Sequence, residues 1–304
     1  AANLTSAILT SANLVSQDLT SVDFEKAVLS GADLTGADLE NAILTGAQLN
    51  TDGTNTVKLM GAILTNAKLI KADLTGADLG VKLHASNVNL NVNTNLVGAD
   101  LTGAILKDAD LASAILVNDT VGSKGANLEK ADLTGADLTA TVFSVTHSTT
   151  EVVTAANLTS AILTSANLSG RDLTNVDFEK ADLSGANLSL ANLQNAILTG
   201  AKMITDGTTS NNGVSADTSG TVNLSGANLT NAKLIKADLT GANLGVKLHA
   251  SDAQQNVNTN LVGADLTGAN LTGTTLTGTN FSDTHSETGV VTAANLSLIH
   301  ISEP

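Results

Sequence analysis

Hydrophobic and polar positions follow one another in this chain with a period of five residues. From Leu29 to Leu49 a leucine stands at every fifth position, and an alanine stands two residues before each of them. On an α-helix a step of five residues advances about 140° around the axis, so these leucines would scatter over all sides and leave no apolar stripe. The pattern therefore excludes a helix.

An extended chain with this period must turn at regular intervals. Residues two apart share one face of a strand, which places Ala and Leu inside and the Asp or Asn between them outside. Because five is odd, a straight strand would turn each successive Leu to the opposite face. The Thr-Gly or Ser-Gly pair that follows many leucines supplies small, permissive residues for a corner. The sequence predicts a narrow solenoid, whose coils stack about 4.8 Å apart with Leu on Leu.

The repeating residues resemble the pentapeptide-repeat family. The unit Ala-(Asp/Asn)-Leu stands at residues 2–4, 32–34, 131–133 and 237–239 among many others, and the repeat covers about three-quarters of the chain. The resemblance implies an all-β fold, a right-handed quadrilateral β-helix with four repeats in each coil. The number of sides and the hand come from this resemblance, whereas the periodicity alone gives only a turning solenoid.

The whole design occurs twice along the chain. Residues 155–163 copy residues 1–9, and residues 257–269 copy residues 92–104. We therefore expect one solenoid built of long repeats. The expected divisions are 1–154 for the first long repeat, 155–292 for the second and 293–295 for the start of a third. The main breaks in the period, which we expect to be loops or short irregular coils, are 51–55, 80–95, 118–124, 204–223 and 245–260.

The two ends of the sequence suggest a piece of a longer repetitive protein. The chain opens in the middle of a repeat, without an initiator Met or a signal peptide, so localisation stays open. Residues 296–304 leave the repeat and read as a translation of the transposon-end and adapter DNA used in sequencing libraries. We expect this segment not to be native, and a natural terminal cap is the alternative.

Composition narrows the class of protein further. Four Phe and no Trp or Tyr would leave a globular core poorly filled, whereas Ala and Leu suit a thin interior. The absence of Cys excludes disulfides and thiolate metal sites. No apolar run approaches the length of a membrane span. A net charge of −15 argues against direct binding of nucleic acid or anionic lipid and favours basic partners or plain solubility.

Four histidines and one polar insert are the candidates for a metal or catalytic site. His84 and His249 recur in Gly-Val-Lys-Leu-His-Ala-Ser, and His147 and His285 recur in Thr-His-Ser, without the spacing of a metal or catalytic motif. We interpret them as loop residues copied by duplication. A calcium site was considered at Asp206, Asn211, Asn212 and Asp217. Their spacing does not fit an EF-hand loop, which favours a mobile polar loop.

Neither an ice-binding face nor an enzyme is favoured. The threonines that follow many leucines would form outward ladders, but Glu25 and Glu40 interrupt them. No phosphate-binding glycine loop and no nucleophile elbow stands in the sequence. The carboxylates belong to the repeat and mark no cleft. We therefore expect no catalysis, no metal and no cofactor.

Outward residues just before the leucines are the candidates for an interaction surface. With twenty residues in each coil, Ile43 and Ile63 would stack on one side and Ile8 and Val28 on the adjacent side. On a further side Asp18 and Asp38 would stack on each other. Such an apolar edge could contact a partner, although single exposed isoleucines are also normal.

Two functions are candidates for a solenoid of this kind. Some members of the resembled family mimic DNA and bind type II topoisomerases. A rod of roughly 50 to 70 Å of duplex DNA would carry about 30 to 40 charges, and this chain carries −15. Asp18, Asp23 and Asp73 of the first copy are matched by Asp172, Asp177 and Asp238 in the second, but Asp33, Asp38 and Asp78 are matched by Asn187, Asn192 and Asn243. Asp and Asn are therefore interchangeable at this position, as expected if it requires only a polar outward side chain. The sequence predicts a non-catalytic structural or protein-interaction solenoid with an unknown protein partner, and a DNA mimic is the alternative.

Overall fold

The computed structural model shows how five residues make one side and one corner of a coil. The residues that it describes are 2–82, 92–118, 120, 123–138, 140–146, 150, 153–204, 222–240, 242–245, 257–284 and 291–293. At a typical corner the Ala7 N–H donates to the Leu4 carbonyl over 2.9 Å. Ser6, the third residue of this four-residue turn, has a φ of 56°. A positive φ at that position is what a type II turn requires, and Gly meets it without strain.

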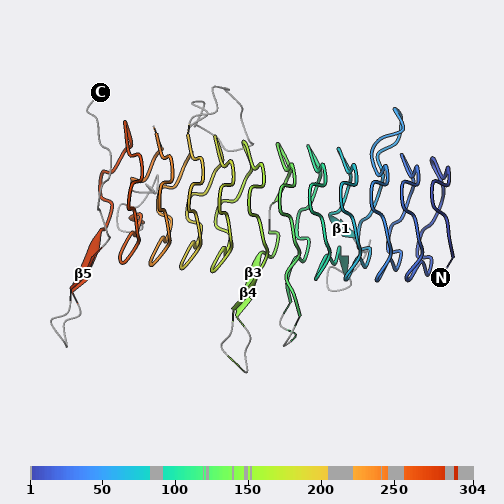
Figure 1. Ribbon diagram of the computed structural model, residues 1–304, viewed down its shortest axis with the longest axis horizontal. Helices are drawn as coiled ribbons and strands as arrows, with labels where there is room; N and C mark the ends of the chain where they lie inside the picture. Colours follow the sequence, from blue (N-terminus) through green and yellow to red (C-terminus); the bar gives the residue numbers. More distant parts are fainter. Residues whose placement is uncertain are drawn as a thin grey trace. The chain divides into compact units, whose positions relative to one another are not determined.

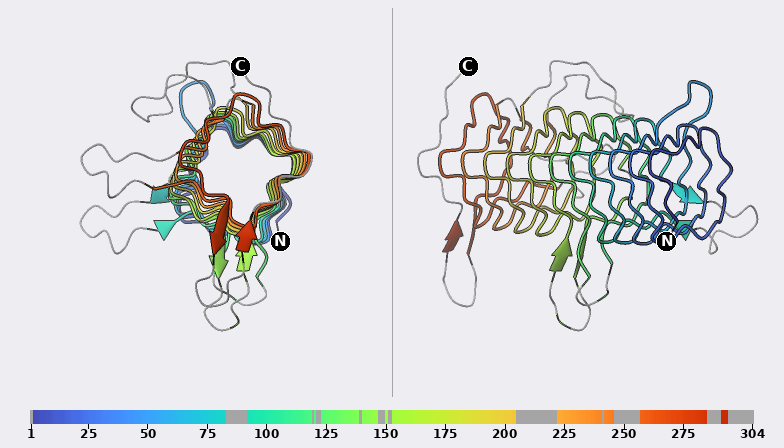
Figure 2. Two further views of the ribbon diagram at one scale, coloured as in Figure 1. Left: turned by 90° about the vertical axis from the view of Figure 1, so that its left-hand side faces the viewer. Right: turned by 45° about the vertical axis from the view of Figure 1, so that its right-hand side comes forward.

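The sides of the coils are held together by parallel bridges. The Leu4 N–H donates to the Asp23 carbonyl over 2.7 Å, and the Asp23 N–H donates to the Ala2 carbonyl over 3.0 Å. Asn3 thus pairs with Asp23, twenty residues further along. Four steps of five residues complete one coil, so the coil has four sides, as the view along the stack shows (Figure 2, left).

The chain divides into two compact units, residues 1–161 and 162–304, which are described separately. Figure 1 shows the coils of each unit stacked one on the next. In each unit the bridging residues form four columns, named A to D, one for each side of the coil. In unit 1, column A is Asn3, Asp23, Ile43, Lys68, Asp100, Asn127 and Asn157. Column B is Ile8, Val28, Gln48, Asp73, Ile105 and Asp132. Column C is Asn13, Asp33, Lys58, Asp78, Asp110 and Asp137. Column D is Asp18, Asp38, Ile63, Asn95, Ile115 and Val142.

The columns of unit 2 take the letters of the unit 1 columns that their residues copy. Column A is Asp177, Ile197, Lys233 and Asp265. Column B is Ile162, Asp182, Lys202, Asp238 and Asn270. Column C is Asn167, Asn187, Asn223, Asn243 and Thr275. Column D is Asp172, Asn192, Asn228, Asn260 and Asn280.

Ala and Leu fill the interior of the coils, as the pattern predicts. Leu34 and Ala32 are fully buried, and the same holds for nearly all their counterparts in later coils. Phe24, Phe143 and Phe178 replace Leu at three positions and are likewise buried. The side chains of adjacent coils lie within one strand spacing of each other, so each coil completes the core of the next.

Insertions leave the coils at three corners, and short hairpins occupy two of them. In unit 1, β1 (Val81–Lys82) pairs antiparallel with β2 (Val92–Asn93) between columns C and D. β3 (Ser144–Thr146) pairs with β4 (Val153–Ala155) after column D. In unit 2, β5 (Ser282–Thr284) pairs with β6 (Val291–Ala293), also after column D. The part of the chain that the structure describes contains no helix.

The corner between columns A and B carries no insertion in either unit. Every residue of column A except Asn157, the last of its column in unit 1, is followed five residues later by one of column B within its unit, for example Lys68 by Asp73. The third corner with an insertion lies between columns B and C, where residues 50–56 leave the coil of unit 1 (Figure 2). Column D of unit 1 therefore lies on the side between the β1–β2 and β3–β4 hairpins (Figure 2, left).

One predicted stacking pair is wrong. Ile8 does pair with Val28 and Asp18 with Asp38, but Ile43 pairs with Asp23 and Lys68, and Ile63 pairs with Asp38 and Asn95. The loop at 50–56 consumes one extra repeat, so the next coil lies 25 residues on, as in the pairing of Asp33 with Lys58. Ile43 and Ile63 thus lie on different sides of the coil.

Candidate interaction surfaces

The outward Asp or Asn of a repeat stabilises the corner that follows it. The Asp33 Oδ1 accepts a hydrogen bond from the Thr35 N–H at 3.0 Å, and the Asn228 Oδ1 accepts from the Thr230 N–H at 3.1 Å. Both are Asx turns, which satisfy a backbone donor at the corner. Asp and Asn offer the same Oδ1, so the fold itself accepts either residue and leaves the charge free to vary.

Charges are largely balanced around columns A and B. Lys107 pairs with Asp132 at 3.4 Å, and Lys202 pairs with Asp182 at 3.0 Å. At the corner between the two columns, Lys pairs with the Glu beside it in Glu25–Lys26, Glu129–Lys130 and Glu179–Lys180. Exposed pairs of this kind contribute little stability, but they cancel the local potential.

Lysine and glycine also alternate at the corner between columns A and B. In unit 1 the position with positive φ is Lys26, Gly46, Lys71, Gly103 and Lys130 in turn, preceded by Ser6 and followed by Ser160. In unit 2 it is Lys180, Gly200, Lys236 and Gly268. A Cβ on Gly46 would stand 3.6 Å from the Lys26 Cγ, and one on Gly200 would stand 3.7 Å from the Lys180 Cγ. Lys26, Lys71, Lys180 and Lys236 thus each lie with their stem beside the glycine of the next coil.

Column C is acidic in unit 1 and uncharged in unit 2. In unit 1, Asp33 is paired with Lys58 at 3.7 Å, whereas Asp78 stacks directly on Asp110. Burial raises the pKa of Asp78, the Gly80 N–H opposes the rise, and the charge of Asp110 adds to it. The corresponding column of unit 2 consists of four Asn and one Thr. The acidic face is therefore a property of unit 1 alone.

Column D of unit 1 is acidic at one end and apolar at the other. Asp18 and Asp38 occupy its first two coils, and Ile63, Ile115 and Val142 occupy three of the next four, with Asn95 between them. Ile63 is 38% exposed, and Ile115 and Val142 are partly exposed. Of the six residues proposed as an interaction surface, this column brings together Asp18, Asp38 and Ile63.

The other three proposed residues lie elsewhere. Ile8 and Val28 stack in column B, where Gln48 and Asp73 follow them, and Ile43 lies in column A between two charged residues. Ile115 and Val142 were not singled out from the sequence, because their column can be assigned only when the length of every inserted loop is known. The signal was present as Ile or Val in the position before a core Leu or Phe.

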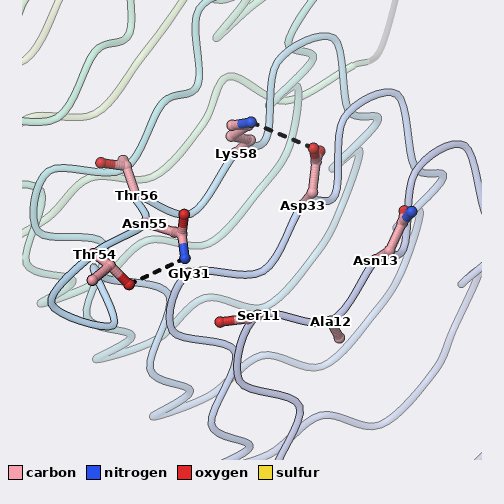
Figure 3. Close-up of a pocket in the computed structure, with 9 residues that line it drawn as sticks. All are labelled: Ser11, Ala12, Asn13, Gly31, Asp33, Thr54, Asn55, Thr56 and Lys58. Atoms are coloured by element: carbon pink, nitrogen blue, oxygen red, sulfur yellow. Dashed lines mark hydrogen bonds and ion pairs between the residues drawn. The ribbon is translucent and has the colours of Figure 1, made fainter.

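The structure also contains a pocket that the sequence did not reveal. Its volume is about 490 Å³, and Figure 3 shows its lining residues, Ser11, Ala12, Asn13, Gly31, Asp33, Thr54, Asn55, Thr56 and Lys58. Asp52 closes the loop over it: its Oδ2 accepts from the Ser11 hydroxyl at 2.5 Å and its Oδ1 from the Asn55 N–H at 2.6 Å. The Ser11 bond, with those of the loop, holds the pKa of Asp52 well below its usual range. The pocket size suits a small polar molecule.

Several candidates from the sequence lie outside the described residues. These are His84, His147, His249, His285, Asp206, Asn211, Asn212, Asp217 and the segment 296–304. Within the described ranges, no group of three or more His, Cys, Asp or Glu side chains converges as a metal site would require. The described part of the chain contains no helix long and apolar enough to cross a membrane.

A parallel solenoid with four five-residue sides in each coil defines a class of repeat proteins, and comparison with known families agrees. A family model described as pentapeptide repeats matches residues 1–36, 23–50, 57–80, 92–118, 124–144, 154–189, 172–204, 222–245 and 257–285. These matches cover more than half of the chain, which therefore belongs to the pentapeptide-repeat family. The predicted fold class, a right-handed quadrilateral β-helix, is confirmed.

Solved structures of the same family resemble the chain. One is HetL, a pentapeptide repeat protein involved in heterocyst differentiation regulation from the cyanobacterium Nostoc sp. strain PCC 7120. It is 27% identical over 93% of this chain and 90% of its own, with a TM-score of 0.39. Another is QnrB1, a plasmid-mediated fluoroquinolone resistance protein, 15% identical over 90% of this chain and 91% of its own, with a TM-score of 0.31. A comparison with curated proteins finds no significant match.

Proposed function

We propose that this chain is a non-catalytic protein-interaction solenoid and that column D of unit 1 is its binding surface. The observation that carries the proposal is the apolar row of Ile63, which is exposed, and Ile115 and Val142, which are partly exposed, continued by Asp18 and Asp38. Apolar side chains gathered on one side of a soluble protein mark a contact surface more often than scattered ones do. The carboxylates support a non-catalytic role, because their Oδ1 atoms are engaged in the turns.

Site-specific crosslinking tests this proposal. A photo-crosslinking amino acid is placed at position 115 in column D, and in a matched protein at position 105 in column B, where Ile105 is also exposed. In an extract of the source cells, position 115 should give discrete protein adducts that excess unlabelled protein abolishes. Position 105 should give few. Equal adducts at both positions, or adducts that the competitor does not reduce, would contradict the proposal.

A DNA mimic that binds a type II topoisomerase is the second candidate, and the acidic column C of unit 1 is the observation that favours it. One carboxylate per coil gives a charge about every 4.8 Å, against one per 3.4 Å along a DNA strand. The neutral column C of unit 2 does not support it. In a gyrase supercoiling assay we expect no strong inhibition. Inhibition at submicromolar protein that is lost when Asp78 and Asp110 of column C, or Asp18 and Asp38 of column D, become Asn would establish the mimic instead.

A further inference from the structure

We infer that column D of unit 1 receives an amphipathic α-helix that has one apolar stripe and basic residues at one end. This inference rests on the proposed function and names the chemistry of the partner. It starts from the order of residues in the column: Asp18 and Asp38, then Ile63, Ile115 and Val142 with Asn95 among them. Glu40, two residues after Asp38, adds a third carboxylate at the acidic end.

The spacing of the column suits a helix. Coils stack about 4.8 Å apart, and one helical turn rises about 5.4 Å. In a helix laid along the column, one apolar side chain per turn would therefore shift relative to the coils by only about 2 Å over three coils. A strand would present side chains to one face about every 6.8 Å and would lose register after one or two coils. From Asp18 to Val142 the column spans five coil steps, roughly 24 Å, the length of about 16 helical residues.

The charges of unit 1 specify a basic partner. Asp18, Asp38 and Glu40 lie at one end of the column, and the adjacent column C adds Asp78 and Asp110, whereas its Asp33 is paired with Lys58. Asp78 and Asp110 stack directly on each other. Burial raises the pKa of Asp78 and the charge of Asp110 adds to the rise, so a cation brought to this side would relieve repulsion. A surface of one sign also speeds the encounter with a partner of the other sign.

Unit 2 shows that the fold does not need apolar residues in this column. There the column is Asp172, Asn192, Asn228, Asn260 and Asn280. The Asn192 Nδ2 donates to the Asp172 Oδ1 at 3.3 Å, and the Asn228 Nδ2 donates to the Asn192 Oδ1 at 3.0 Å. Asn95 in unit 1 likewise accepts from the Val97 N–H at 3.0 Å. Ile or Val at these positions cannot form these hydrogen bonds. Unit 1 has exposed apolar surface in place of them, which favours a binding role for its column D.

Binding of designed peptides tests the inference. Peptide one is a labelled helix of about 18 residues with a leucine stripe and lysines in one terminal turn. Peptide two replaces those lysines with glutamates, and peptide three keeps the composition of peptide one but scatters the leucines. Fluorescence anisotropy should show peptide one binding at least about tenfold more tightly than either control. Its circular dichroism should gain helix on binding.

Protein variants locate the site of binding. Ile63→Asn, Ile115→Asn and Val142→Asn combined should weaken peptide one by about tenfold or more. The control Ile105→Asn in column B should leave affinity unchanged. Ile115→Lys alone, which places a cation against the basic helix, should weaken binding too and guards against misfolding of the triple variant. Asp18→Asn with Asp38→Asn should reduce the salt dependence of binding.

Three results would overturn the inference: no preference among the peptides, equal binding by the triple variant, or loss of binding in Ile105→Asn alone. These results are separable from failure of the proposed function. If the peptides do not bind but position 115 still gives competitor-sensitive protein adducts, the helix is wrong and the interaction surface stands. If peptide one binds but no adducts form, the proposed function fails by itself.

Discussion

The third residue of each corner shows how far a single backbone angle constrains this repeat. It has positive φ in every described corner that keeps the five-residue spacing, and the residues that adopt it include Lys130, Leu190 and Ala140 besides many glycines. An L-residue with a side chain pays roughly 1 kcal/mol for this conformation, and glycine does not. The residue before it has ordinary φ, so neighbouring positions of one turn should respond oppositely to the same change.

Ala140→Gly should therefore stabilise the protein by about 0.5 to 1 kcal/mol, because φ at Ala140 is 56°. Ala112→Gly, at the second residue of an equivalent turn, should destabilise it by a similar amount, since there glycine only adds freedom to the unfolded chain. Urea unfolding of the two variants measures both effects. The same sign in both variants would show that turn conformation is not the controlling factor.

Asp78 offers a prediction about pH. Its folded-state pKa is raised by burial and by Asp110, so the folded protein holds this proton more tightly than the unfolded chain does. The side chain stabilises the fold below its ordinary pKa of 3.8, and that contribution is lost as pH rises through the folded pKa. Asp78→Asn should thus stabilise the protein at pH 7 by about 0.5 kcal/mol and have no such effect near pH 3.

Asp33→Asn is the matched control for Asp78. Burial also pushes the pKa of Asp33 upward, but the Thr35 bonds and Lys58 outweigh it and hold the pKa below its usual value. At pH 7 the substitution removes the pairing with Lys58 and should be neutral or slightly destabilising. Thermal unfolding at the two pH values compares the variants, and a gain in Asp33→Asn as large as in Asp78→Asn would contradict the assigned cause.

At the scale of elements, the sequence predicts which residues of each side point into the coil and which point out. It does not predict which residues of successive coils stack on each other. The period of five excluded a helix and placed Leu34 inside and Asp33 outside, as observed. The predicted register is wrong at Ile63. Leu49 and Leu59 are two periods apart, so their spacing alone does not show whether the repeat between them forms a side of the coil or a loop. The sequence predicts a break at 51–55 as either a loop or a short irregular coil, and the structure shows that residues 50–56 leave the coil as a loop, in which Asp52 accepts a hydrogen bond from Ser11. The assignment of residues to columns, and with it the candidate site, depends on the number of residues that this loop adds to its coil.

The β1–β2 hairpin is fixed to its coil by a buried hydroxyl. The Thr94 Oγ1 accepts from the Gly61 N–H at 2.9 Å and lies 2.9 Å from the Leu59 carbonyl and 3.0 Å from that of Gly80. Thr94→Val keeps the shape but leaves buried polar groups unpaired, so it should cost about 1 to 3 kcal/mol. Thr94→Ser keeps the hydroxyl and should cost less. Equal losses in calorimetry would mean that packing, not hydrogen bonding, holds the hairpin.

At the scale of each whole unit, every coil is stabilised mainly by its contacts with the coils next to it. Leu34 is fully buried between stacked coils, and Leu34→Asp would bury a charge there, a loss expected to exceed about 3 kcal/mol. In hydrogen exchange, protection should fall most in the coils next to Leu34 and recover with distance along unit 1, because contacts are made mainly between neighbouring coils. A uniform loss along unit 1, or one no larger than that of Asp33→Asn, would contradict this picture.

Because lysine and glycine alternate at the corner between columns A and B, odd and even coils differ at this corner. Lys26 lies beside Gly46 and Lys71 beside Gly103, so lysines return only at every second coil. Removing one coil would set lysine on lysine at about 4.8 Å, with like charges adjacent and no glycine to admit the stem. Removing two coils would restore the pattern. The solenoid should therefore tolerate growth and loss by even numbers of coils better than by odd numbers.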